Sequence, residues 1–208
     1  MTDFYLVRHG ESLANVERRF DATLPGAPLS PRGLEQAELV ADWFEAQGVL
    51  PDLLLASPFA RTRQTARPLH RRAGRSLLLA DLLRETSVGQ WDGRFSRDML
   101  EDPRYLAWRD DPEIAPPGGE RLSDVARRLR LLLDTLRRLS PDSSAALFTH
   151  QHGLRAGLSL TASLRDETGR LKPVPNCAIV HLRLDREGLR LIALDQSIHL
   201  ATRQAEAG

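Results

Sequence analysis

The chain opens on an apolar run that leads directly into charged side chains: Phe4-Tyr5-Leu6-Val7-Arg8-His9-Gly10-Glu11-Ser12. The apolar residues predict a short buried strand that ends at Val7. An arginine and a histidine are costly to bury without a partner, so their place directly after the strand indicates a functional role. Gly10 lacks a side chain, which allows other atoms to approach its backbone closely. We interpret the stretch as an anion site, with phosphate as the expected anion and His9 placed to attack it.

The size and composition are those of a globular protein. The chain has 208 residues, of which 41% are hydrophobic and 27% charged, so we expect one domain over residues 1–208 with a core of its own. The net charge of +1 offers no electrostatic basis for binding nucleic acid or an anionic membrane. Cys177 is the only cysteine, which excludes an intramolecular disulfide. With no recognisable signal peptide or membrane-spanning run, we expect a cytoplasmic protein. We expect it to be a monomer or a homodimer.

Strand and helix signals alternate along the rest of the chain. The predicted strands cover residues 53–56, 77–80 and 145–149, and the predicted helices cover about residues 31–47, 60–73, 122–136 and 153–164. This alternation predicts an α/β fold with a doubly wound, mostly parallel central sheet flanked by helices. Residues 178–182 and 189–193 form two last strands. Because their connecting turn is too short for a crossover helix, one edge of the sheet should be antiparallel.

The segment of residues 86–120 departs from this pattern. It is rich in glycine, proline and tryptophan, and its short pieces follow no regular period. We predict an insertion, or lid, within the single domain that folds over the carboxyl ends of the strands.

Polar side chains follow four of the predicted strands. They are Arg8 and His9, then Ser57 with Arg61, then Glu85, and finally His150. Taken singly, each except His9 is more simply explained as a surface or capping residue. Because ligands of parallel α/β sheets bind at the carboxyl ends of the strands, however, these side chains should meet. Together they favour a catalytic site.

Five segments, in order and at suitable spacing, resemble the motifs of the histidine phosphatase (phosphoglycerate mutase-like) superfamily. They are residues 6–15, 29–37, 57–66, 83–93 and 148–155. Five collinear motifs are a far more specific match than the first motif alone. Gln151 follows His150 where most members have glycine, as in the fructose-2,6-bisphosphatase branch. His152, which precedes Gly153, is the alternative second histidine, but the strand-end position and the spacing to Arg155 favour His150.

The resemblance implies a small, metal-independent phosphatase that hydrolyses phosphomonoesters of small metabolites through a phosphohistidine. His9 would attack as a neutral imidazole, a form that neighbouring cations favour. Arg8 and Arg61 would bind the phosphoryl oxygens with forked N–H donors, so neither a metal nor another cofactor is expected. Glu85 would protonate the leaving group and then deprotonate water, with burial or the bound phosphate retaining its proton. His150 would supply a further donor.

The remaining predicted contacts surround these residues. The phosphate and substrate contacts are Ser12, Asn15, Phe20, Thr23 and Gln151, with Trp91 and Arg94 as further candidates. Two alternatives stay open. A phosphoglycerate mutase would carry a longer insertion with paired arginines, whereas the arginines of residues 86–120 are scattered. A non-catalytic phosphate-binding or interaction module would usually lack His9 or Glu85, and both are present.

Overall fold

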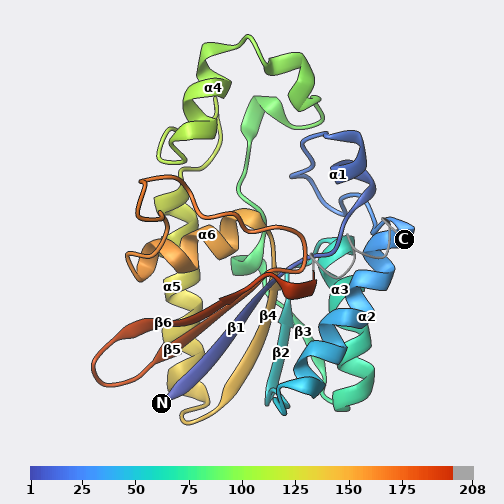
Figure 1. Ribbon diagram of the computed structural model, residues 1–208, viewed down its shortest axis with the longest axis vertical. Coiled ribbons are helices and arrows are strands. Elements are labelled where there is room, and N and C mark those ends of the chain that lie inside the picture. Colours follow the sequence, from blue (N-terminus) through green and yellow to red (C-terminus); the bar gives the residue numbers. More distant parts are fainter. Residues whose placement is uncertain (199–208) are drawn as a thin grey trace.

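A six-stranded sheet with the order β3-β2-β4-β1-β5-β6 forms the centre of the protein, which a computed structural model describes over residues 1–198 (Figure 1). The strands are β1 Thr2–Arg8, β2 Leu53–Ala56, β3 Leu77–Leu79, β4 Ser144–Thr149, β5 Ile179–Leu184 and β6 Leu189–Asp195. β1 pairs in parallel with β4, β4 with β2, and β2 with β3. β5 runs antiparallel to β1, and β6 antiparallel to β5. The mostly parallel sheet with an antiparallel edge is therefore confirmed. Residues 199–208 of the predicted domain lie outside the described residues.

Helices cover both faces of the sheet, as the doubly wound prediction requires. They are α1 Leu13–Glu17, α2 Pro31–Ala46, α3 Ala60–Ala73, α4 Pro103–Asp110, α5 Leu122–Leu139 and α6 Gln151–Leu160, with the 3-10 turns η1 Asp81–Leu83, η2 Gly89–Trp91 and η3 Ser96–Met99. α5 and α6 pack on one face, and α2 and α3 on the other (Figure 1). Within residues 1–198, no helix combines the length and apolar character needed to cross a membrane.

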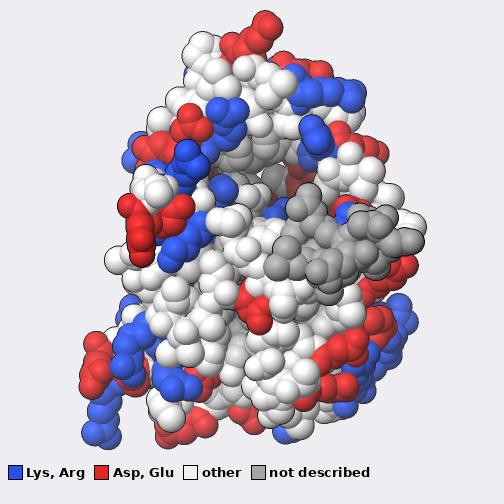
Figure 2. Space-filling model, in the orientation of Figure 1, with Lys and Arg blue, Asp and Glu red and all other residues white. Residues whose placement is uncertain are grey.

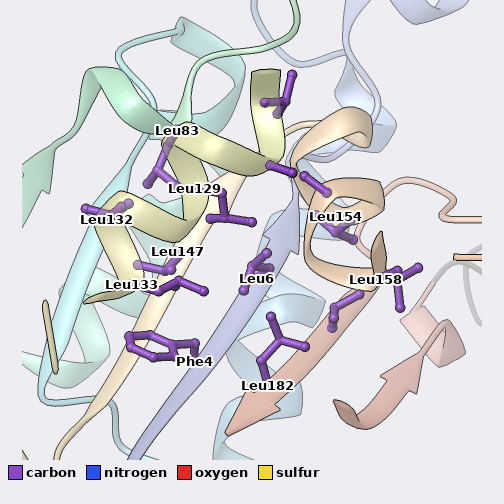
Figure 3. Packing of buried hydrophobic residues seen from close by; sticks show 14 of the residues in the cluster. Phe4, Leu6, Leu83, Leu129, Leu132, Leu133, Leu147, Leu154, Leu158 and Leu182 are labelled. Atoms are coloured by element: carbon purple, nitrogen blue, oxygen red, sulfur yellow. The ribbon is translucent and has the colours of Figure 1, made fainter. Parts of the chain in front are cut away.

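The alternation of side chains along β1 explains how one strand holds both layers. Phe4 and Leu6 point to the α5–α6 face, whereas Tyr5 and Val7 point to the α2–α3 face. Leu6 lies among the leucines of α5 and α6 (Figure 3). Full burial of such a side chain stabilises the fold by about 1.5–3 kcal/mol. The strand that carries Arg8 at its end is thus anchored from both sides.

Several predicted elements differ from the structure by a few residues in their bounds, and β3 and α6 show why. The third strand is only Leu77–Leu79, and Leu78 and Leu79 are exposed because β3 is an edge strand. The helix expected from residue 153 to residue 164 is α6, which begins at Gln151 and ends at Leu160. It begins earlier because the first turn of a helix needs no intrahelical N–H partners, so polar residues are tolerated there.

The segment of residues 86–120 lies above the carboxyl ends of the strands, where α4 is labelled in Figure 1. Its own small core consists of Val88, Trp91, Met99 and Tyr105. Backbone hydrogen bonds tie it to the loop after α1, where Phe20 pairs with residues 93 and 94. The segment therefore covers the strand ends while remaining attached to the loop that follows β1.

Candidate active site

The carboxyl ends of the strands open into a cavity of about 370 Å³. The surface is hollowed beneath the segment of residues 86–120, and Arg side chains lie around this hollow (Figure 2). The lining residues include Arg8, His9, Ser12, Asn15, Phe20, Arg61, Glu85, Trp108, Gln151, His152 and Arg155. Side chains from β1, α1, α3, α4 and α6 thus meet in one place.

His9 is held as one tautomer. Its Nδ1 lies 2.7 Å from the carbonyl oxygen of Gly10, and its Nε2 lies 3.1 Å from Nε of Arg61. A carbonyl only accepts and a guanidinium only donates, so we assign the proton to Nδ1 and the lone pair to Nε2. Burial, followed by the charges of Arg61, His150 and Arg8, holds the pKa of His9 well below its usual range. The imidazole is therefore neutral and able to act as a nucleophile.

Two glycines allow the backbone around His9 to pack tightly. A Cβ on Gly10 would lie 2.6 Å from the carbonyl oxygen of Gly33, and a Cβ on Gly33 would lie 2.0 Å from that of Glu11. Both obstacles are backbone atoms that cannot turn aside. The start of α2 is consequently pressed against the segment that carries His9, which confirms the close approach expected at Gly10.

Arg61 enters the site from the first turn of α3. Its side chain is 4% exposed, and Nη1 and Nη2 donate to the carboxylate and the carbonyl oxygen of Asp21 at 2.8 and 2.9 Å. Burial lowers the pKa of Arg61, and the charges of Glu85 and Asp21 oppose the shift. The guanidinium stays charged at neutral pH, and Asp21 and His9 fix its orientation.

Arg8 and Arg155 add two further, partly buried guanidinium groups. Nη1 of Arg8 donates to the carbonyl oxygen of Val174 at 2.7 Å. The Nε of Arg8 and the Nε of Arg155 are buried and have no hydrogen-bond partner among the described residues. Burial lowers the pKa of Arg8 to about 10. Because unpaired buried donors are costly, these two N–H groups favour the binding of an anion.

His150 lies one layer below His9 and does not line the cavity. The two rings meet edge to face with centroids 5.3 Å apart, and Nε2 of His150 is 2.9 Å from Oγ of Ser57. Burial, followed by the charge of Arg61, holds the pKa of His150 well below its usual range. Its Nδ1 is buried and unpartnered within the described part of the chain. Of the two histidines in this motif, only His152 lines the cavity.

Glu85 follows η1 and is held by its surroundings. Oε1 accepts a hydrogen bond from the Thr86 N–H at 2.8 Å and lies 3.3 Å from Nδ1 of His152. Its carbonyl oxygen accepts a hydrogen bond from Arg128 of α5. Burial would raise the pKa of Glu85, but His152, His150 and the Thr86 N–H together hold it well below its usual range. With the protein's own charges alone, Glu85 is a carboxylate. Burial by itself therefore does not retain its proton.

The other predicted contacts divide into two groups. Asn15, Ser12, Phe20 and Gln151 line the cavity. The Ser12 hydroxyl accepts the backbone N–H of Asn15 at 3.2 Å, so it caps α1. The side-chain Oδ1 of Asn15 accepts a hydrogen bond from the backbone N–H of Ser12. The side-chain NH₂ of Asn15 therefore remains for a ligand.

Thr23, Trp91 and Arg94 do not line the cavity. The Thr23 hydroxyl donates to Asp92, the Trp91 ring lies in the small core of residues 86–120, and Arg94 is exposed.

Two residues that position these side chains were not predicted from the sequence. Asp21 orients Arg61, and the side chain of Asn176 donates to the carbonyl oxygen of His9 at 3.0 Å and to Asn15 at 3.2 Å. Neither stands next to a motif arginine or histidine, so only spatial proximity identifies them. Within residues 1–198, no group of three or more His, Cys, Asp or Glu side chains is placed to hold a metal ion.

Comparisons with known proteins agree with this geometry. The model of the histidine phosphatase superfamily (branch 1) matches residues 4–197. A probable phosphoglycerate mutase, GpmB of Yersinia pestis, is 31% identical over 184 residues, which are 86% of this chain and 83% of the relative.

Two solved structures have similar folds. Mycobacterial glucosyl-3-phosphoglycerate phosphatase has a TM-score of 0.79 at 30% identity, covering 93% of this chain and 96% of its own. A putative alpha-ribazole-5'-P phosphatase from Escherichia coli has a TM-score of 0.75 at 24% identity, covering 94% and 96%. At that identity the second structure supports the fold alone.

Proposed function

Because the chain belongs to branch 1 of the histidine phosphatase superfamily, we propose that it is a metal-independent phosphomonoester hydrolase that forms a phosphohistidine on His9. The substrates are small phosphorylated metabolites, and the site of action is the cytoplasm. The observation that carries the proposal is the neutral imidazole of His9, whose Nε2 faces Arg61 in a cavity lined by further arginines.

Charge stabilisation in this mechanism comes from the arginines. The transferring phosphoryl group spreads negative charge over its equatorial oxygens, so fixed donors lower the barrier. Arg8 and Arg61 supply these donors, and the amide of Asn15 adds another. The unpartnered Nδ1 of His150 is a further candidate donor from below.

The reaction proceeds in two displacements. Nε2 of His9 gives up the hydrogen bond that it accepts from Nε of Arg61 and attacks phosphorus, and the alcohol leaves as Glu85 delivers a proton to its oxygen. Water then attacks the phosphohistidine, and Glu85 takes the proton that the water loses. A negative phosphate beside Glu85 favours its protonated form, which counteracts the cations that keep it ionised in their absence.

Hydrolysis is favoured over mutase activity by the arrangement of residues 86–120. Of the arginines in this segment, Arg94, Arg97 and Arg104 are exposed, and Arg109 reaches the cavity lining alone. Residues 86–120 therefore place no pair of arginines in the cavity lining that could bind a substrate carboxylate. The 30% identical relative is named a phosphatase, and a related structure of that enzyme, 28% identical to this chain, contains inorganic phosphate. Mutase activity is the second candidate because the curated relative carries that name.

The test is phosphate release from a panel of phosphomonoesters, with and without a metal chelator. We expect release by the wild type that persists with chelator, is abolished in His9→Ala and is strongly reduced in Glu85→Gln. His70→Ala is the matched control, because His70 lies outside the cavity lining near the end of α3. Absence of release from every ester by a folded protein would exclude a general phosphatase. Interconversion of phosphoglycerates at a rate rivalling hydrolysis would establish the mutase instead.

A further inference from the structure

His152 is a buried histidine in direct contact with the proposed acid. It lies in the first turn of α6 and is 6% exposed, and its Nδ1 is 3.3 Å from Oε1 of Glu85. Both ring nitrogens are buried without a well-formed hydrogen bond to any described residue. The imidazole lines the same cavity as His9. A buried imidazole without a satisfied nitrogen needs an explanation, and its carboxylate neighbour suggests one.

An aromatic cover shields this contact from water. The ring of Trp108, from α4, lies over His152 with centroids 5.5 Å apart and planes tilted by 32°. Trp108 packs in turn against Phe20, Trp91 and Tyr105. Because charges interact more strongly where water is excluded, His152 and Glu85 are placed to affect each other's protonation.

The other charged groups around the pair make Glu85 a poor holder of a proton. They are Arg8 from β1, Arg61 from α3, Arg109 from α4, Arg128 from α5 with its partner Glu120, and His150 and Arg155 at α6. All except Glu120 are cationic or can become so, and they favour the carboxylate form of Glu85. The same charges oppose an imidazolium at His152, which the contacting carboxylate of Glu85 stabilises. The leaving alkoxide nevertheless requires a proton. A neighbouring group that stores one would resolve this conflict.

We propose that His152 stores the proton that Glu85 delivers, so that the two side chains act as one acid–base pair. This inference rests on the phosphatase function proposed above. His152 acts through Glu85 and is therefore a positioning residue for the proton rather than a second acid on the substrate.

Atoms and charges balance in both steps. As the bond from Nε2 of His9 to phosphorus forms, the bond from phosphorus to the leaving oxygen breaks. That oxygen keeps the electron pair and takes the proton that passes from Nδ1 of His152 through Glu85, which leaves His152 neutral and Glu85 a carboxylate. In the second step, the water oxygen bonds to phosphorus, the P–N electron pair returns to His9, and the proton lost by water passes through Glu85 back to His152.

The pair should remain protonated at higher pH than a carboxyl group alone. An ordinary imidazole holds its proton about two pH units higher than an ordinary glutamate. Two groups in contact titrate together, with values that belong to the pair. The basic limb of the pH profile of kcat/KM should therefore depend on His152.

The first experiment is the pH profile of phosphate release by wild type, His152→Gln and the control His70→Gln. Glutamine has a similar polarity but does not titrate. We expect His152→Gln to remain within about threefold of wild type at pH 5 and to fall by about tenfold or more at pH 8. His70→Gln should follow the wild type. A uniform loss at every pH, with the basic limb unmoved, would assign His152 a merely structural role and overturn the proposal. Failure of the wild type itself to release phosphate would instead overturn the phosphatase function.

The second experiment does not depend on turnover. The imidazole of His152 is followed by NMR titration, with its signal identified by its absence in His152→Gln. In Glu85→Gln the response of this signal to pH should differ from that in the wild type, because the carboxylate in contact with Nδ1 of His152 has been removed. An unchanged response would show that the two groups do not share a proton.

Discussion

Arg61 donates a hydrogen bond from Nε to Nε2 of His9 over 3.1 Å, while Asp21 holds both of its Nη atoms. The contact ties the first turn of α3 to the end of β1. It directs the lone pair of the proposed nucleophile toward the group that would bind the phosphoryl oxygens. One arginine therefore couples the orientation of His9 to the binding of the anion, and two predictions can be tested at this pair.

Replacing Arg61 with lysine should impair catalysis while leaving the fold intact. A single ammonium cannot contact His9 and Asp21 together and also bind two phosphoryl oxygens. We expect kcat/KM for the best ester to fall by about 100-fold. Arg63→Lys, two positions along α3 on an exposed site, is the matched control. If Arg61→Lys kept wild-type kcat/KM, the forked geometry would be irrelevant.

The pH profile of kcat/KM should report the low pKa of His9. A group whose pKa is depressed stays neutral to lower pH, so no acid limb from His9 should appear near the usual range of histidine. Arg61→Gln removes a nearby positive charge that contributes to this depression. Its acid limb should therefore move to higher pH than that of wild type, as measured with an ester whose own ionisation is corrected for. If the acid limb of Arg61→Gln moved to lower pH instead, this would contradict the assignment of neutral His9 as the reactive form.

Gly33→Ala should destabilise the protein and disturb the site together. The new Cβ would lie 2.0 Å from the carbonyl oxygen of Glu11, so the backbone next to His9 must move. We expect a loss of about 1–3 kcal/mol in the free energy of unfolding, measured by denaturant titration. Glu35→Ala, at an exposed position two residues along α2, should change stability little. Equal stability of the two variants would mean that the contact between the start of α2 and residue 11 is loose.

Asp3→Asn tests an ion cluster away from the site. Oδ1 of Asp3 lies 2.7 Å from Nε2 of His181 and 2.8 Å from Nε of Arg183. Burial opposes the charge of Asp3, but these two contacts hold its pKa below the usual value of 3.8. The stabilisation is therefore present above the unfolded pKa and is lost as the pH falls through the folded one. We expect Asp3→Asn to cost about 1 kcal/mol at pH 7, and this cost to shrink as the pH falls below 3.8. A cost that did not change with falling pH would point to packing rather than charge.

Much of the fold could be predicted from local patterns, because periodicity reports which side of an element is buried. The run Phe4–Val7 alternates between two helical layers, and the apolar stripe of α5 covers one face of the sheet. The meeting of Arg8, Arg61 and Glu85 could also be predicted, since the carboxyl ends of parallel strands lie at one edge. The bounds of β3 could not be predicted in this way. β3 is an edge strand whose residues are partly exposed, so its apolar pattern does not mark where the pairing with β2 ends.

The sequence by itself determined the layered α/β architecture and the set of side chains delivered to the strand ends, since both follow from local periodicity and chain direction. Only the tertiary structure decided which of these side chains line the cavity and which partners each of them contacts. Thr23 is turned away by a hydrogen bond to Asp92, which is distant in sequence. His150 and His152 stand two residues apart, yet one lies beneath His9 and the other against Glu85. His150 has extended backbone at the N-cap of α6, whereas His152 lies within the first turn of the helix, so the two side chains leave the backbone in different directions and meet different partners.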